Sequence, residues 1–439
     1  MNTRQLGFWM CTALVVGNTI GMGIFVQPAV LAPYGLNALT GWAAVVLGCA
    51  SIAIVLAVLA RRLPEADGPF GYIRATLGEP VAFPALWCYW ISTWVTNAAI
   101  AVAVVGYAVT VVPALAAIQP AVLAVGFMWL FVVINWFGAR TGGRVQVVTV
   151  VLKLTPLVLV MVLGSVAILS EPATYVANLP TTPITLNATM AASAVALFAM
   201  LGIESATVPA GRVTDPGRTI PRATLIGTLI VAVVYVTIVV VGMLLVPQAT
   251  LASSDAPFVT IMSSLLGAGV GRWVALFVVI SGLGALNGWT LLVGELTRTL
   301  ASNRLLPEFL GRVNSHGAPA AALIVTAVLA SAIALMGASD VMVTAVTFLT
   351  TLVAAANLPL YLCVALALLY LWFRDRASLP RHVWIFGLGG VAFSVFAFIG
   401  VGTRELLWAL VLALAGLPVY FWMRWRHPVP VIAGTAPPL

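Results

Sequence analysis

Long apolar stretches separated by short polar segments repeat along almost the whole chain. Twelve of them are long enough to cross a bilayer, which takes about 20 residues of α-helix. The predicted spans are 6–34, 38–60, 81–112, 119–139, 146–169, 188–211, 222–246, 272–300, 319–338, 341–372, 383–402 and 405–423. This pattern predicts an all-α integral membrane protein.

Composition favours the membrane over two or three soluble domains. Hydrophobic residues make up 62% of the chain and charged residues 7%, whereas a soluble domain carries roughly 25% charged side chains. No cleavable signal is expected, because the first apolar run is too long and lacks a small-residue cleavage pattern. The four cysteines lie in apolar spans at unrelated spacings, which indicates neither a disulfide framework nor a metal site.

The basic residues alternate with the predicted spans. If the N-terminus is inside, seventeen of the 20 basic residues fall in inner segments and only Arg272 and Arg404 in outer ones. The remaining one, Lys153, lies inside the fifth span. Because Lys and Arg gather in cytoplasmic loops, both termini are predicted on the cytoplasmic side of the membrane. The same rule accounts for the net charge of +8 without a nucleic-acid partner.

The first span carries three glycines within seven residues, in the stretch Gly17-Asn-Thr-Ile-Gly-Met-Gly23. Glycine costs about 1 kcal/mol relative to alanine inside a helix, and a helix break exposes backbone groups that lipid cannot satisfy. Close helix packing through small residues is one explanation. However, Asn18 and Thr19 add polar side chains, and the sixth span is similarly irregular at Gly202 and Glu204. Matched interruptions predict a transporter of inverted repeats, with its site at the broken helices.

Electrostatics suggests what such a site would bind. A helix that restarts after a break offers free N–H groups and a partial positive charge, which suit a carboxylate. The helix end before the break offers carbonyl groups, which suit an ammonium group. Glycine lets the backbone approach a ligand closely. The two breaks together would therefore bind the part that all amino acids share.

Three motifs resemble the amino acid/polyamine/organocation (APC) transporters. They are G-x-G-I-F in the first span, F-A-x-x-G-I-E-S-A at 198–206, and the loop Asp215-Pro-Gly-Arg-Thr-Ile-Pro-Arg-Ala-Thr224. The resemblance runs nearly end to end and is greatest to the bacterial basic amino acid antiporters of the arginine/agmatine type. It implies twelve transmembrane helices: a LeuT-like 5+5 inverted repeat in residues 1–374, with helices 1 and 6 broken, and two further helices in 375–425. A cytoplasmic tail at 426–439 would follow. The implied activity is exchange of amino acids or related amines by alternating access.

The resemblance also implies a substrate site. Gly21 and Gly23 would frame the carboxylate, Asn97 would contact the distal part of the substrate, and Trp289 would pack against its apolar stem. Packing and inter-helix hydrogen bonding are the alternative roles for Asn97 and Trp289. Met22 and Phe198 depart from the Ser and Trp of the antiporters, so arginine itself is left open as the substrate. The full predicted set is Asn18, Thr19, Gly21, Met22, Gly23, Thr93, Asn97, Phe198, Gly202, Glu204 and Trp289.

Two ionisable residues are candidate coupling groups. Lys153, the only lysine, lies about nine residues past Arg144, and thus roughly 13 Å from the inner helix end. Snorkelling works mainly near helix ends, so a charge at this depth is a functional candidate. Several APC relatives have a lysine at the corresponding place, where it stands in for a sodium ion. That similarity supports the alternative of a proton-coupled symporter for neutral amino acids. Glu204 is the second candidate, with a structural role as its alternative.

Other classes of function fit the sequence less well. The three histidines lie at loop or terminal positions without metal-ligand spacing, and no GxxxxGK phosphate loop occurs. An enzyme, a bound metal, a cofactor and ATP-driven transport are therefore not expected. A channel is the remaining rival, but it needs a continuous pore and often symmetry between subunits. Small-molecule substrate and membrane lipid are the expected partners, with proton coupling and a homodimer left open.

Overall fold

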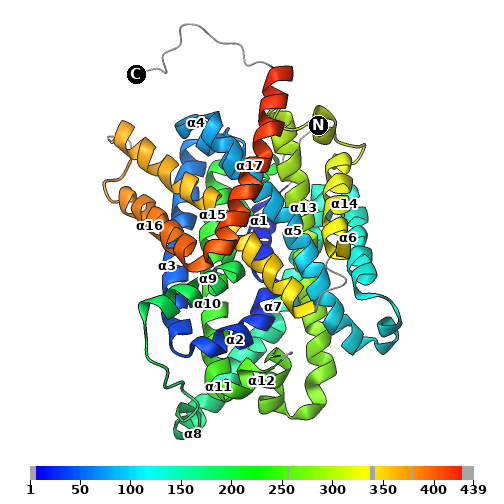
Figure 1. Ribbon diagram of the computed structural model, residues 1–439, viewed down its shortest axis with the longest axis vertical. Helices are drawn as coiled ribbons and strands as arrows, with labels where there is room; N and C mark the ends of the chain where they lie inside the picture. The colour runs from blue at the N-terminus through cyan, green and yellow to red at the C-terminus, as the bar shows by residue number, and fades with distance from the viewer. Residues whose placement is uncertain (1–5, 255–256, 337–341, 377–378, 428–439) are drawn as a thin grey trace.

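The computed structural model describes residues 6–427 except 255–256, 337–341 and 377–378 (Figure 1). These residues form a bundle of α-helices joined by loops and short 3-10 helices. The α-helices are α1 (Phe8–Thr19), α2 (Gly23–Leu31), α3 (Asn37–Arg62), α4 (Gly68–Leu77), α5 (Glu79–Val111), α6 (Pro120–Trp136), α7 (Ala139–Ser170), α8 (Pro172–Val176), α9 (Leu186–Met200), α10 (Pro216–Leu245), α11 (Gln248–Ala252), α12 (Pro257–Leu266), α13 (Gly271–Ser302), α14 (Ala320–Met336), α15 (Met342–Arg374), α16 (Val383–Val401) and α17 (Thr403–Arg426).

The multi-pass helical membrane architecture is confirmed. In the described part of the chain, nine helical stretches are long and apolar enough to span a bilayer. The predicted spans 119–139, 188–211 and 319–338 contain shorter apolar helices of 17, 15 and 17 residues, namely α6, α9 and α14. The boundary between the ninth and tenth predicted spans falls at 337–341, and most of the predicted tail at 428–439. Both lie outside the described residues.

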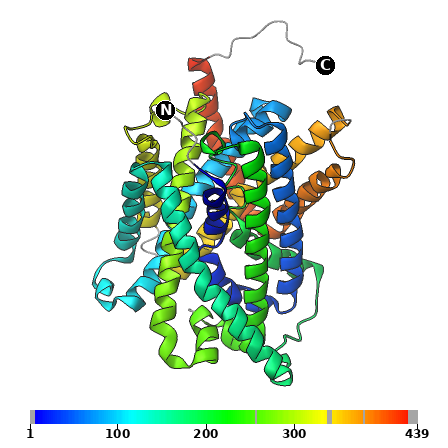
Figure 2. The ribbon, with the colours of Figure 1, turned by 180° about the vertical axis from the view of Figure 1, so that it is seen from behind.

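The first helix lies in the middle of the bundle in both views (Figures 1 and 2). It packs against α7, α10 and α13, while α5 packs against α13 and α15. Another group forms around α3, which contacts α9, α10 and α16. The short helices α8, α11 and α12 lie at the end of the molecule opposite α4 (Figure 1). The interrupted first span is therefore surrounded by protein rather than exposed to lipid.

The chain ahead of α1 pairs with the chain that follows α9. Leu6 N donates to Arg212 O at 3.0 Å, and Thr214 N donates to Leu6 O at 2.9 Å. This short parallel bridge joins the predicted inner ends of the first and sixth spans, which are far apart in the sequence. Arg212 is also tied to α13, because its Nε lies 3.4 Å from Glu295 Oε2.

Three of the predicted inner segments lie at the same end of the bundle. Arg74 Nη1 donates to Asn303 Oδ1 at 2.8 Å, and Asn303 Nδ2 donates to Asp67 Oδ2 at 3.1 Å. At the base of α5, Glu79 forms an ion pair with Arg424 of α17. The loop after α3, the end of α13 and the end of α17 thus lie at one end of the bundle.

Candidate functional site

The first span is interrupted at the place that its glycines predict. The helix α1 ends at Thr19, and α2 begins at Gly23. Between them Ile20 has ψ 82°, which is not helical, and Gly21 N turns back to Thr19 O at 2.9 Å. The break leaves the last carbonyl groups of α1 without partners in their own helix.

Side chains from three neighbouring helices satisfy these carbonyl groups. Trp289 Nε1 of α13 donates to Asn18 O at 3.0 Å, and Tyr235 Oη of α10 donates to Thr19 O at 3.0 Å. Lys153 Nζ of α7 donates to Gly17 O at 2.8 Å and to Ile20 O at 2.6 Å. A backbone break inside a membrane protein is tolerated only with such partners. These bonds therefore stabilise the interrupted helix.

The sixth span is interrupted next to the first. The helix α9 ends at Met200, and the chain continues through turns to Arg212. Gly202 has φ +113°, a backbone conformation that residues other than glycine rarely adopt. A Cβ at Gly202 would also lie 3.0 Å from the backbone nitrogen and the hydroxyl of Thr19. The two breaks therefore lie in direct contact, and Gly202 is what allows it.

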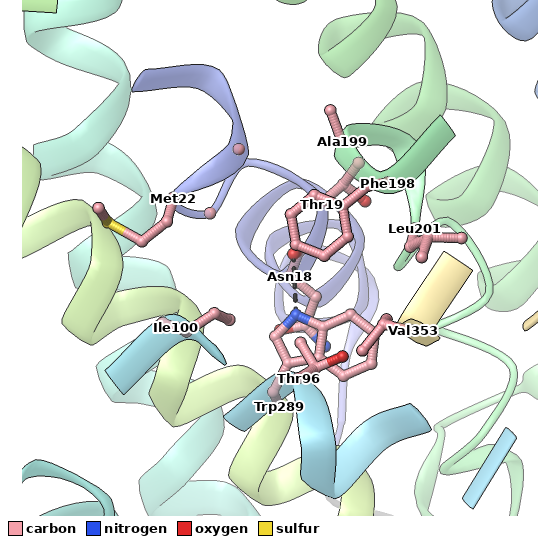
Figure 3. A pocket seen from close by; sticks show the side chains of 12 residues that line it. Asn18, Thr19, Met22, Thr96, Ile100, Phe198, Ala199, Leu201, Trp289 and Val353 are labelled. Atoms are coloured by element: carbon pink, nitrogen blue, oxygen red, sulfur yellow. Dashed lines mark hydrogen bonds between the residues drawn. The ribbon is translucent and has the colours of Figure 1, made fainter. Parts of the chain in front are cut away.

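A small buried cavity lies between the two breaks (Figure 3). Figure 3 shows Met22 and Ile100 on one side of it, Phe198 and Val353 on the other, and a dashed line for the bond from Trp289 to α1. The residues that line the cavity are Asn18, Thr19, Gly21, Met22, Gly23, Thr96, Ile100, Phe198, Ala199, Leu201, Trp289 and Val353. None of these side chains is ionisable, so the cavity wall combines apolar groups with hydroxyl and amide groups.

Seven of the predicted site residues line this cavity, and four do not. Thr93 Oγ1 donates to Trp90 O at 2.7 Å within α5, and Asn97 Oδ1 accepts from Thr290 Oγ1 at 3.4 Å. Gly202 and Glu204 lie in the break behind the cavity wall. The seven that line it are Asn18, Thr19, Gly21, Met22, Gly23, Phe198 and Trp289.

The sequence interpretation missed five lining residues, of which Thr96 and Ile100 are the most informative. Both lie on the same face of α5 as the predicted Thr93 and Asn97, because positions 93, 96, 97 and 100 have the i, i+3, i+4, i+7 spacing of one helical face. Because α5 is buried on nearly all sides, its hydrophobic pattern does not single out Thr96 and Ile100 within that face. Ala199, Leu201 and Val353 are apolar residues with no distinguishing signal.

Glu204 is held by hydroxyl groups from two long helices. Its Oε1 accepts from Tyr89 Oη of α5 at 2.9 Å, and its Oε2 accepts from Tyr361 Oη of α15 at 2.7 Å. Gly202 N also donates to Oε2, at 3.3 Å, and the side chain is fully buried. The carboxyl group therefore ties the break in the sixth span to α5 and α15.

Lys153 extends from α7 to the break in the first span. Its side chain is fully buried, and its amine is bonded to the carbonyl groups of α1. A snorkelling lysine would extend toward a helix end instead. The only lysine of the chain is thus directed into the break of the first span.

A multi-pass helical bundle with two interrupted spans around one buried cavity has the architecture of a secondary transporter. The chain belongs to the amino acid permease family, whose sequence model matches residues 6–421. Membership makes it a transporter of the amino acid and polyamine class rather than an enzyme, and implies a LeuT-like fold.

Individual relatives are similar over most of their length. The cadaverine/lysine antiporter of Escherichia coli (strain K12) is 32% identical over 337 residues, which are 76% of this chain and 75% of that protein. The putrescine transporter PotE of the same strain is 27% identical over 426 residues, or 95% and 96% of the two chains. The putrescine transporter PotE of Haemophilus influenzae (strain Rd) is 26% identical over 431 residues, or 97% and 98%.

The contact between the two breaks predicts that Gly202→Ala destabilises the protein. A non-glycine residue in a sparsely populated backbone region costs about 1–3 kcal/mol, and the added methyl group would also press on Thr19. We expect a lower thermal midpoint and slower transport. The measurements are melting of the purified protein and uptake at matched protein levels.

The matched control is Gly126→Ala in α6, where an added methyl group meets no atom within 4 Å. This change should leave the midpoint equal or slightly higher, because alanine is the better helix former. If both variants melted and transported alike, the close contact between the breaks would be contradicted.

Proposed function

We propose that this protein exchanges an amino acid or a related amine across the bacterial cytoplasmic membrane by alternating access. The observation that carries the proposal is the buried cavity whose wall contains residues from both helix breaks. The cavity is too small for an amino acid, so a ligand could bind between the two breaks only if the helices around them move, which is the behaviour of a carrier. A channel would instead need a continuous pore.

The backbone around the cavity suits the common part of an amino acid. The helix α2 begins at Gly23, and the N–H groups at the start of a helix lack helical partners and favour a carboxylate, although Phe25 N already donates to Met22 O. The last carbonyl groups of α1 already accept from Trp289, Tyr235 and Lys153. We therefore assign the substrate's ammonium group to the end of α9. Thr19 Oγ1, which is buried on the cavity wall without a partner, would supply one more polar contact.

We further propose the family topology for the whole chain. Twelve spans would cross the membrane, with α1 and α2 as one broken helix and α9 with residues 201–212 as the other. The 5+5 inverted repeat would occupy residues 1–374, and α16 and α17 would be the two additional helices within 375–425. The skewed distribution of arginine supports cytoplasmic termini and a cytoplasmic tail from residue 426.

The substrate side chain has two candidate classes. Relatives named for cadaverine, lysine and putrescine, and the resemblance to arginine/agmatine antiporters, favour a basic amino acid or an amine. Trp289 and Phe198 both present aromatic side chains to the cavity, where a cation could stack. The alternative is a neutral amino acid moved with a proton. It is supported by the apolar side chains of Ile100 and Val353 and by the lack of an ionisable lining residue.

For coupling we propose Lys153 and Glu204. Lys153 places an amine on the carbonyl groups of the first break, where the resemblance to APC transporters implies that a lysine stands in for a sodium ion. Glu204 bridges the second break to α5 and α15 through Tyr89 and Tyr361. A change in the charge of either residue would alter the hydrogen bonds that hold a break in place.

The exchange proposal predicts that uptake depends on substrate inside the vesicle. Purified protein in proteoliposomes would be tested with labelled L-lysine, cadaverine, putrescine, L-arginine, agmatine and L-leucine, in vesicles loaded with the same unlabelled compound or empty. We expect at least one compound to enter loaded vesicles several-fold faster. Equal initial rates in loaded and empty vesicles would favour proton symport, and uptake without counterflow would favour a channel.

The cavity geometry predicts unequal effects for Trp289 and Asn97. Trp289→Ala removes both an aromatic wall and the donor to Asn18 O, so we expect KM to rise about tenfold or more. Asn97→Ala should raise KM less, because its carboxamide meets Thr290 behind the wall. Trp273→Ala, on the exposed face of α13, is the matched control. Normal kinetics in both site variants would assign both residues to packing.

The bonds of Lys153 predict that Lys153→Ala slows transport or removes its pH dependence. Loss of two bonds from a buried amine leaves two carbonyl groups unpaired, so we expect a decrease of about tenfold or more. The wild type should not require sodium. The measurement is uptake against pH, with and without sodium, at matched protein levels. Arg144→Ala removes an exposed cation from the same helix and is the control. An unchanged rate and pH profile in Lys153→Ala would leave Glu204 as the remaining candidate.

A further inference from the structure

A chain of buried polar side chains runs from the cavity wall into the interior of the bundle. Asn18 Nδ2 donates to Ser205 Oγ at 2.9 Å, and Asn18 Oδ1 accepts from Gln146 Nε2 at 3.5 Å. Gln146 Oε1 accepts from Asn287 Nδ2 at 3.1 Å, and Asn287 Oδ1 accepts from Asn135 Nδ2 at 3.1 Å. All five side chains are buried. They connect α1, the second break, α7, α13 and α6.

Gln146 reaches the first helix through a gap that two glycines leave open. A Cβ at Gly17 would overlap the Gln146 amide nitrogen. A Cβ at Gly288 would overlap Asn18 Oδ1 and lie 2.7 Å from Gln146 Nε2. Alanine at either position would therefore displace the amide groups. Gly17 begins the glycine-rich stretch of the first span. Its lack of a side chain is explained by the space that Gln146 needs rather than by the helix break.

Gln146 contacts the cavity wall from behind. It is not a lining residue, but Asn18 is, and the neighbour of Gly288 is the lining residue Trp289. Asn18 is held at two points, because its carbonyl oxygen accepts from Trp289 and its side chain bonds Ser205 and Gln146. The Asn18 carboxamide in the wall is thus held by Gln146 of α7 and by Ser205 of the second break, while α13 holds the Asn18 backbone.

Packing alone does not explain a glutamine at this position. A fully buried amide costs free energy unless its polar atoms find partners, and an apolar side chain of the same length would fill the gap without that cost. The partners of Gln146 are distributed unequally. Its bond with Asn287 of α13 is 3.1 Å long, whereas its bonds with Asn18 Oδ1 and Ala13 O of α1 are both 3.5 Å. Gln146 is therefore anchored on α13 and extends to α1.

We propose that Gln146 is a positioning residue of the substrate site. It orients the Asn18 carboxamide in the cavity wall and thereby sets substrate affinity, without contacting the substrate. This inference rests on the proposed function of the cavity as the substrate site. It adds to that site a residue from outside the cavity and names Asn18 as the residue through which it acts.

The test is a double-mutant cycle between Gln146 and Asn18 in proteoliposomes. Gln146→Met keeps the length and stem of the side chain but removes its hydrogen bonds. We expect it to raise KM about three- to tenfold, which is the effect of one or two lost hydrogen bonds, with Vmax within about twofold. In an Asn18→Ala background the same change should leave KM unaltered, because the residue through which Gln146 acts is gone. The probe is the compound that the wild type takes up fastest among L-lysine, cadaverine, putrescine, L-arginine, agmatine and L-leucine.

The matched control is Gln248→Met, which removes a partly buried amide bonded to Ala32 O at 2.8 Å; neither residue lines the cavity or belongs to the chain of polar side chains. It should leave KM within about twofold. Gln146→Ala repeats the test with a smaller side chain in case the methionine variant does not reach the membrane. Equal KM in wild type and Gln146 variants, or an equal rise in both Asn18 backgrounds, would overturn the positioning role. A wild type that transports none of the compounds would instead overturn the proposed function.

Discussion

The structure depends on one constraint, namely that a carbonyl or N–H group inside a membrane protein must have a partner. A continuous helix meets it internally, but the first span gives up this solution between Thr19 and Gly23. The free carbonyl groups are then satisfied by Trp289, Tyr235 and Lys153. Each of these side chains belongs to a different long helix. The bonds at the break therefore hold α7, α10 and α13 in place around α1, and these three helices in turn stabilise the break.

The same constraint separates two kinds of polar group at the centre of the bundle. Those on the carbonyl side of the first break are fully engaged with protein. Of the polar side chains that line the cavity, Asn18, Thr96 and Trp289 are also bonded within the protein, whereas the hydroxyl of Thr19 has no partner. The protein thus satisfies the groups that would otherwise destabilise it and leaves one hydroxyl that the proposed substrate could complete. Glu204, bonded by Tyr89 and Tyr361, is engaged in the same way as the carbonyl groups.

Much of this arrangement could be predicted from the sequence, because it follows from strong local signals. The length of the apolar stretches predicts the membrane spans, and glycine with adjacent polar residues predicts both breaks. The position of Lys153 in the middle of a span predicts that its side chain is buried. Which residues on this face of α5 line the cavity could not be predicted, since a helix buried on nearly all sides has no polar stripe that marks single positions. The role of Gln146 was also hidden. It depends on Gly17 and Gly288, which are far apart in sequence and meet only in the fold.

The backbone bridge at Leu6 has a mechanical meaning. It joins the chain ahead of the first interrupted span to Arg212 and Thr214, behind the second. Deeper in the bundle the same two spans touch again at Gly202 and Thr19. Two contacts at different positions along the spans resist both separation and relative rotation of the two spans. Either span can shift alone only by breaking backbone hydrogen bonds, so a motion that preserves them carries both interrupted spans together.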